Sequence, residues 1–192
     1  IKNGTTSVMT FCTSFKQSVE AFFKAAENRN LRMVAGKVMM DRHAPDELCD
    51  NPDNSYSDSK ELIEKWHNKG RLRYAVTPRF APTSSSSQLN QAARLLNEYP
   101  SDDQTKGVLL QTHLNENDEE IAWVNDLFPD SNSYFGVYED HGITGNRSVF
   151  GHCIHNTEEE YQRMAKTGSK VSLCPTSNLF LGSGLFELEK LE

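Results

Sequence analysis

The chain has 192 residues, of which 36% are hydrophobic and 24% charged, and its formal net charge is −7. These values are typical of a soluble globular protein with one domain of sizeable core. The negative charge argues against a nucleic-acid partner, which needs clustered Lys and Arg. No apolar run approaches the roughly 20 residues of a membrane-spanning helix, so no membrane partner is expected. The four cysteines form no CxxC pair, which favours reduced thiols and a cytoplasmic location.

Apolar, β-branched runs alternate with helical patterns along the whole chain. In chain order, strands are expected at residues 6–11, 31–39, 73–76, 108–112, 149–152 and 170–174. Helices are expected between them at residues 15–28, 59–69, 86–99, 116–127 and 157–167. Ser57 is the expected cap of the second helix and Gly70 its stop. This alternation predicts an α/β protein with parallel strands.

The architecture follows from where the polar residues lie. The glycine-rich signatures of doubly wound nucleotide-binding folds do not occur in the sequence. Polar residues follow the strand ends instead, where a barrel keeps its active site: Arg79, His113, His152 and Asn178. A complete barrel needs about 250 residues. We therefore expect a partial (β/α)8 TIM-type barrel of about six βα units.

His113 and Glu116 lie three residues apart in QTHLNEND, where the fourth predicted strand ends. Neutral imidazole is a good ligand for zinc or iron, and a nearby carboxylate can shuttle protons without binding the metal. A hydrogen-bonded histidine beside a glutamate at a helix start is the structural alternative. His152 ends the next strand, so its side chain is expected beside His113, which strengthens the metal interpretation.

Arg79 and Phe80 lie in TPRFAPT, directly after the third predicted strand. Arginine offers a planar fork of donors, and phenylalanine offers a face for a flat heterocycle. A surface arginine paired with an acid, next to a core phenylalanine, would leave the same pattern. The segment CPTSNLFLGSG at residues 174–184 is expected to form a structured loop over the site.

Taken together, QTHLNEN, TPRFAPT, GHC and CPTSNLFLGSG, with NGTTS and GKVMMDR in the same order, resemble the guanine deaminase family of the amidohydrolase superfamily. The resemblance implies a metal-dependent (β/α)8 barrel that hydrolyses guanine to xanthine and ammonia. It implies His113 and His152 as metal ligands, with zinc as the cofactor and iron as the alternative. It implies Glu116 as the catalytic proton shuttle for attack of a metal-activated hydroxide at C2, and Arg79 with Phe80 as the guanine-binding residues.

The chain also departs from that family. Family members carry an HxH pair on the first barrel strand and a metal-binding Asp after the eighth, and neither has a counterpart here. We therefore expect residues 1–192 to form a single incomplete barrel domain that lacks catalytic activity alone and can lack the metal. Its open sheet edges favour a homo-oligomer. A non-catalytic α/β fragment, or an amidohydrolase that deaminates a triazine or pterin, are the remaining alternatives.

Overall fold

The computed structural model of the protein describes residues 2–100 and 106–191. Its strands are β1 (Ser7–Phe11), β2 (Arg32–Gly36), β3 (Val38–Met39), β4 (Arg73–Pro78), β5 (Leu109–Leu114), β6 (Ser148–His152) and β7 (Lys170–Ser172). Its α-helices are α1 (Lys16–Glu27), α2 (Pro52–Trp66), α3 (Ser86–Glu98), α4 (Asp118–Leu127), α5 (Tyr134–Asp140), α6 (Glu158–Thr167) and α7 (Pro175–Leu181). Short 3-10 helices are η1 (Asp46–Leu48), η2 (Ala81–Thr83) and η3 (Leu188–Leu191).

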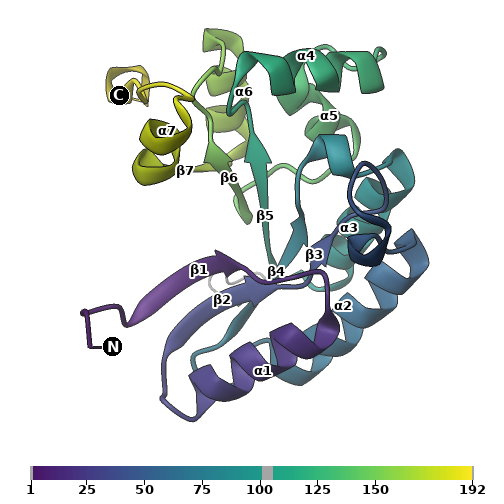
Figure 1. Cartoon of the computed structure of the whole chain (residues 1–192), viewed down its shortest axis with the longest axis vertical. Coiled ribbons are helices and arrows are strands. Elements are labelled where there is room, and N and C mark those ends of the chain that lie inside the picture. Colours follow the sequence, from purple (N-terminus) through teal and green to yellow (C-terminus); the bar gives the residue numbers. More distant parts are fainter. Residues whose placement is uncertain (1, 101–105, 192) are drawn as a thin grey trace.

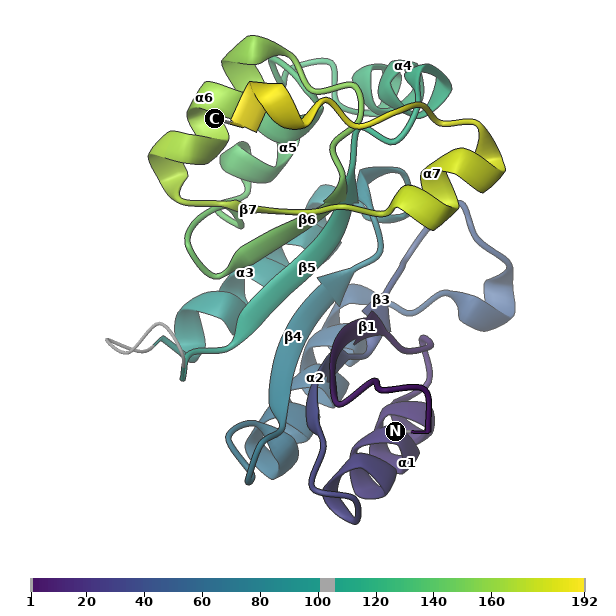
Figure 2. The same ribbon diagram turned by 90° about the vertical axis from the view of Figure 1, so that its left-hand side faces the viewer.

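The strands form one parallel sheet in the order β1-β2-β4-β5-β6-β7, and the two-residue strand β3 pairs with β4. Figure 1 shows helices α1, α2 and α3 along one face of this sheet. Figure 2 looks onto the face that these helices leave open. This parallel half-barrel confirms the predicted fold class.

The sheet curls, so that strands distant in its order meet across the concave face. The side chain of Gln111 on β5 donates hydrogen bonds to the carbonyl oxygen of Thr10 on β1 (2.8 Å) and to the hydroxyl of Thr77 on β4 (3.1 Å). Gly36 allows β2 to approach β4 closely, because a Cβ atom there would lie 1.8 Å from the carbonyl oxygen of Ala75. Such curvature brings the strand ends around a common centre.

The hydrophobic core lies between the convex face of the sheet and its helices. The rings of Phe23 on α1 and Trp66 on α2 stack with centroids 5.8 Å apart, and Phe23 also meets Tyr74 on β4. Leu89 and Leu95 of α3 are fully buried in the same cluster. Full burial of each such side chain stabilises the fold by about 1.5–3 kcal/mol. The core thus fixes the strands whose carboxyl ends carry the site.

Two predicted elements near the amino terminus were wrong in their bounds. The expected strand 31–39 is divided into β2 and β3 at Lys37, whose buried side chain forms an ion pair with the partly exposed Asp50. The expected helix 59–69 begins at Pro52, and the side chain of Asn51 caps it by accepting a hydrogen bond from the backbone of Asn54. Ser57 lies inside this helix and does not cap it.

Three further differences lie near the site. Helix α4 begins at Asp118, with Asn117 as its cap, so Glu116 precedes the helix. Helix α5 was not predicted, and the segment 174–184 contains helix α7 where only a loop was expected.

None of the described helices has the length and apolar composition needed to cross a membrane.

Candidate functional site

The carboxyl ends of β5 and β6 bring two histidines together. Leu114 pairs with His152 in the register of these strands, so His113 lies one residue away on the neighbouring strand. The two imidazole rings are nearly parallel, with centroids 5.3 Å apart. Glu116 completes the cluster, because its Oε2 atom lies 3.5 Å from Nε2 of His152.

Hydrogen bonds orient both imidazole rings in the same sense. Nδ1 of His113 lies 2.7 Å from the carbonyl oxygen of Arg79, and Nδ1 of His152 lies 2.8 Å from Oδ1 of Asn178. Both partners are oxygens that can only accept, so each Nδ1 donates, and in the neutral form of each ring Nε2 then carries the lone pair. Burial lowers the pKa of His113, which favours its neutral form. Neutral imidazoles with free Nε2 atoms can bind a metal.

Arg79 and Phe80 follow β4 at the same edge of the sheet. The guanidinium of Arg79 lies 5.1 Å from the centre of the Phe80 ring, and that ring meets His113 edge-on with centroids 6.3 Å apart. Arg79 is exposed, and among the described residues no carboxylate lies within ion-pair distance of it. The arginine fork is therefore available to a ligand, and the alternative of a surface ion pair does not apply.

The segment after β3 holds the loop that carries Arg79 and Phe80 in place by hydrogen bonds. The guanidinium of Arg42 donates to the carbonyl oxygens of Ala81 and Pro82, both at 3.1 Å. The carboxylate of Asp41 accepts from the backbone and the hydroxyl of Ser85. The segment GKVMMDR, one of those that carry the family resemblance, thus positions the TPRFAPT loop through Asp41 and Arg42.

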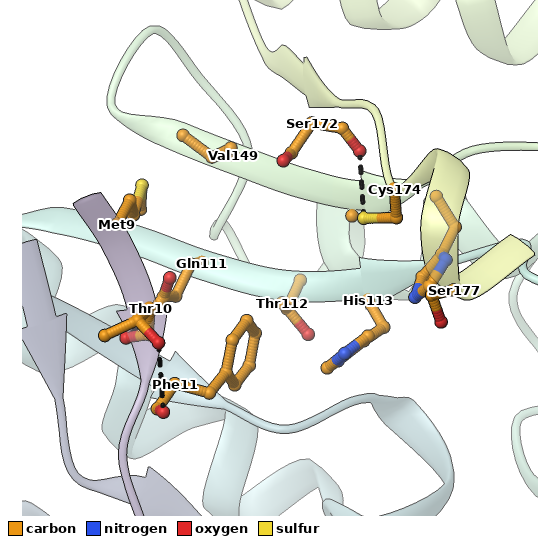
Figure 3. A pocket seen from close by; sticks show the side chains of 12 residues that line it. Met9, Thr10, Phe11, Gln111, Thr112, His113, Val149, Ser172, Cys174 and Ser177 are labelled. Carbon is orange, nitrogen blue, oxygen red and sulfur yellow. Dashed lines mark hydrogen bonds between the residues drawn. The ribbon is translucent and has the colours of Figure 1, made fainter. Parts of the chain in front are cut away.

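Two adjoining cavities open at these residues. One, of about 470 Å³, lies between the loop after β1, strand β3, Arg79 and His113. The other, of about 370 Å³, lies on the concave face of the sheet. Figure 3 shows Phe11 of β1 beside His113 of β5 at this second cavity, with Cys174 and Ser177 at the same end as His113 and Met9 at the other. The side chain of His113 lines both cavities, so a small heterocycle in either one would contact it.

The imidazole nitrogens at this site are suitable ligands for zinc or iron, but there are too few of them for a complete metal site. Imidazole nitrogens suit both metals, and His113 with His152 supplies two of them. A catalytic zinc site usually has three protein ligands. Within the described part of the chain, no group of three or more His, Cys, Asp or Glu side chains could hold a metal ion. A complete metal site therefore needs ligands other than those described.

Sequence reasoning left two contributing residues without a role. Asn178 stood in the quoted segment CPTSNLFLGSG, and its position after a strand was the available signal. The buried hydroxyl of Tyr138 donates to the carbonyl oxygen of His113 (2.8 Å) and accepts from the backbone of Ala81 (3.0 Å). It joins the strand that carries His113 to the loop that carries Arg79, but it lies on α5, which has no helical pattern in the sequence.

Comparison with known proteins gives consistent matches along the chain. A sequence model of the Amidohydrolase family matches residues 1–192. Guanine deaminase of Escherichia coli strain K12 is 54% identical over 190 residues, which are 99% of this chain and 42% of that protein. Its solved structure superposes with a TM-score of 0.95 over 100% of this chain and 43% of its own.

A second solved structure is similar at lower identity. Guanine deaminase from C. acetobutylicum, solved with guanine bound in its active site, is 35% identical with a TM-score of 0.92. The match covers 99% of this chain and 44% of that one. The present chain therefore spans less than half the length of the relatives that it matches.

Proposed function

The chain belongs to the amidohydrolase family, and from that premise we propose that it forms part of a guanine deaminase, which converts guanine and water to xanthine and ammonia. The 54% identity to the E. coli enzyme supports this activity over related ones. The observation that carries the proposal is the convergence of His113, His152 and Glu116 beside Arg79 and Phe80 at one sheet edge.

The binding roles follow from the side chains. Arg79 would donate hydrogen bonds to the carbonyl edge of the purine, because its donor fork has no competing carboxylate among the described residues. Phe80 would contact the ring system. His113 and His152 would bind the metal through Nε2, since each Nδ1 is already engaged.

The proton-transfer role falls to Glu116. A metal bound here would supply an activated water for attack on C2. Glu116 would transfer both protons of that water, the first to the ring nitrogen and the second to the amine as it leaves. Its carboxylate lies beside His152 and precedes α4, at the edge of the sheet where the substrate would bind.

We further propose that residues 1–192 form one incomplete barrel domain that is inactive alone. Zinc is the proposed metal, with iron as the alternative. The open edges at β1 and β7 would pair with further strands or with a second copy of the chain. Its free cysteines fit the reducing cytoplasm as its location, and its charge of −7 supports a small-molecule partner over nucleic acid.

A chimeric enzyme tests this proposal. The matched segment of E. coli guanine deaminase is replaced by this chain, and production of xanthine and ammonia from guanine is measured. We expect an active chimera whose activity falls about 100-fold or more in the Glu116→Gln variant. Glu119→Gln, which changes an exposed carboxylate in the first turn of α4, is the matched control and should change little. A folded chimera that deaminates a triazine or pterin in place of guanine would contradict the proposal.

A further inference from the structure

Helix α7 buries its amide side chain and exposes its apolar ones. Asn178 is 2% exposed, whereas Leu179 and Phe180 of the same helix are 65% and 88% exposed. A helix that packs only for stability does the reverse, because burial of apolar surface is what stabilises the packing. Departures of this kind concentrate at functional sites. The burial of Asn178 is therefore explained by what its amide contacts.

That contact is the imidazole of His152. Oδ1 of Asn178 lies 2.8 Å from Nδ1 of His152, and the histidine is itself 4% exposed. His152 and Cys153 both have positive φ angles, 69° and 52°, which residues other than glycine rarely adopt. This backbone turn is unfavourable by itself and places His152 against α7, which is typical of strain retained at a site.

The same segment also reaches the carboxylate of Glu116. The backbone of Ser183 donates to the carbonyl oxygen of Asn178 (2.9 Å), which closes the turn after α7. The Ser183 hydroxyl lies 3.4 Å from Oε1 of Glu116, whose other oxygen faces Nε2 of His152. The buried polar atoms of α7 and its turn thus meet the two groups to which proton transfer and metal binding are assigned.

We propose that Asn178 is a positioning residue that fixes the tautomer of His152, with the hydrogen on Nδ1 and the lone pair on Nε2, which lies 3.5 Å from Oε2 of Glu116 without a hydrogen bond between them. The chemical purpose of this tautomer rests on the proposed function, since only a free Nε2 can bind a metal or accept a proton there. A neutral histidine in water prefers the opposite tautomer, with its hydrogen on Nε2. The amide oxygen of Asn178 reverses that preference by accepting from Nδ1.

NMR of the imidazole nitrogens in the ¹⁵N-labelled chain tests this inference without any activity measurement. The spectra are recorded well above the ordinary pKa of histidine, and the His152 signals are identified by their loss in His152→Gln. We expect Nδ1 of His152 to show the shift of a protonated ring nitrogen and Nε2 that of an unprotonated one. Asn178→Asp keeps the acceptor and should keep this pattern, whereas Asn178→Leu should reverse it.

His113 is the internal control, because its Nδ1 faces the backbone of Arg79 and should not respond to either variant. A hydrogen on Nε2 of His152 in the unmodified chain would overturn the inference, whether or not the variants fold. The E. coli chimera separates the two proposals. The predicted tautomer together with an inactive chimera would support the role of Asn178 and contradict the proposed function. An active chimera with the opposite tautomer would support the proposed function and contradict the role of Asn178.

Discussion

Glu120 gives the sharpest stability prediction. It lies in the first turn of α4 and is only 8% exposed. Burial is the main cause that raises its pKa from 4.5 to about 7, and the charge of Glu116 adds to this, while the Tyr134 hydroxyl and Arg79 lower the pKa in part. The folded chain therefore binds this proton more tightly than the unfolded chain.

The difference in pKa between the folded and unfolded chain sets how the free energy of unfolding changes with pH. A raised acid pKa contributes stability that is fully present below pH 4.5 and is lost as the pH rises through about 7. A shift of this size corresponds to about 3 kcal/mol at most, because each pKa unit is about 1.4 kcal/mol. The Glu120→Gln variant removes the ionisation, so it should be about 2–3 kcal/mol more stable than the unmodified chain at about pH 8 and nearly equal at about pH 4.

Urea denaturation followed by fluorescence measures the difference, with the buried Trp66 as the reporter. Glu119→Gln, at the exposed neighbouring position, is the control and should change the free energy of unfolding by less than about 0.5 kcal/mol at either pH. A Glu120→Gln effect that is the same at both pH values would refute the assignment of a buried, proton-binding carboxyl.

Three further predictions use other parts of the chain. Thr157→Ala removes the capping box of α6 and should lower the free energy of unfolding by about 1 kcal/mol in urea; an unchanged midpoint would contradict this role. Gly36→Ala should abolish cooperative thermal unfolding, because its Cβ would meet the Ala75 carbonyl at 1.8 Å, and a normal transition would show that β2 can move away. Arg79→Ala in the E. coli chimera should lower kcat/KM for guanine about 10- to 100-fold, whereas an unchanged value would remove Arg79 from recognition.

The alternation of strands and helices was predictable because both the apolar runs and the helical spacing are local signals. The pairing of His113 with His152 was predictable for a related reason, since parallel strands place their carboxyl ends at one edge. Asn51-Pro52 is also a helix-start signal, because proline favours the first helical position, whereas Ser57 lies inside α2.

Other features depend on tertiary packing that local patterns do not encode. Helix α5 buries five consecutive residues from Tyr134 to Tyr138, so it has no polar face and no amphipathic period. Helix α7 has Pro175 at its start and Gly182 in a left-handed conformation at its end, yet its exposed Leu and Phe side chains invert the usual pattern. The contact of Asn178 with His152 arises from that inverted packing.

We propose above that this chain supplies the guanine-binding and proton-transfer half of a deaminase site. The most direct measurement is the rate of guanine deamination by the E. coli chimera that contains this chain, with and without Glu116→Gln. We expect release of xanthine and ammonia that depends on Glu116. A chimera that folds and binds zinc but leaves guanine unchanged, or one that is indifferent to Glu116→Gln, would contradict it.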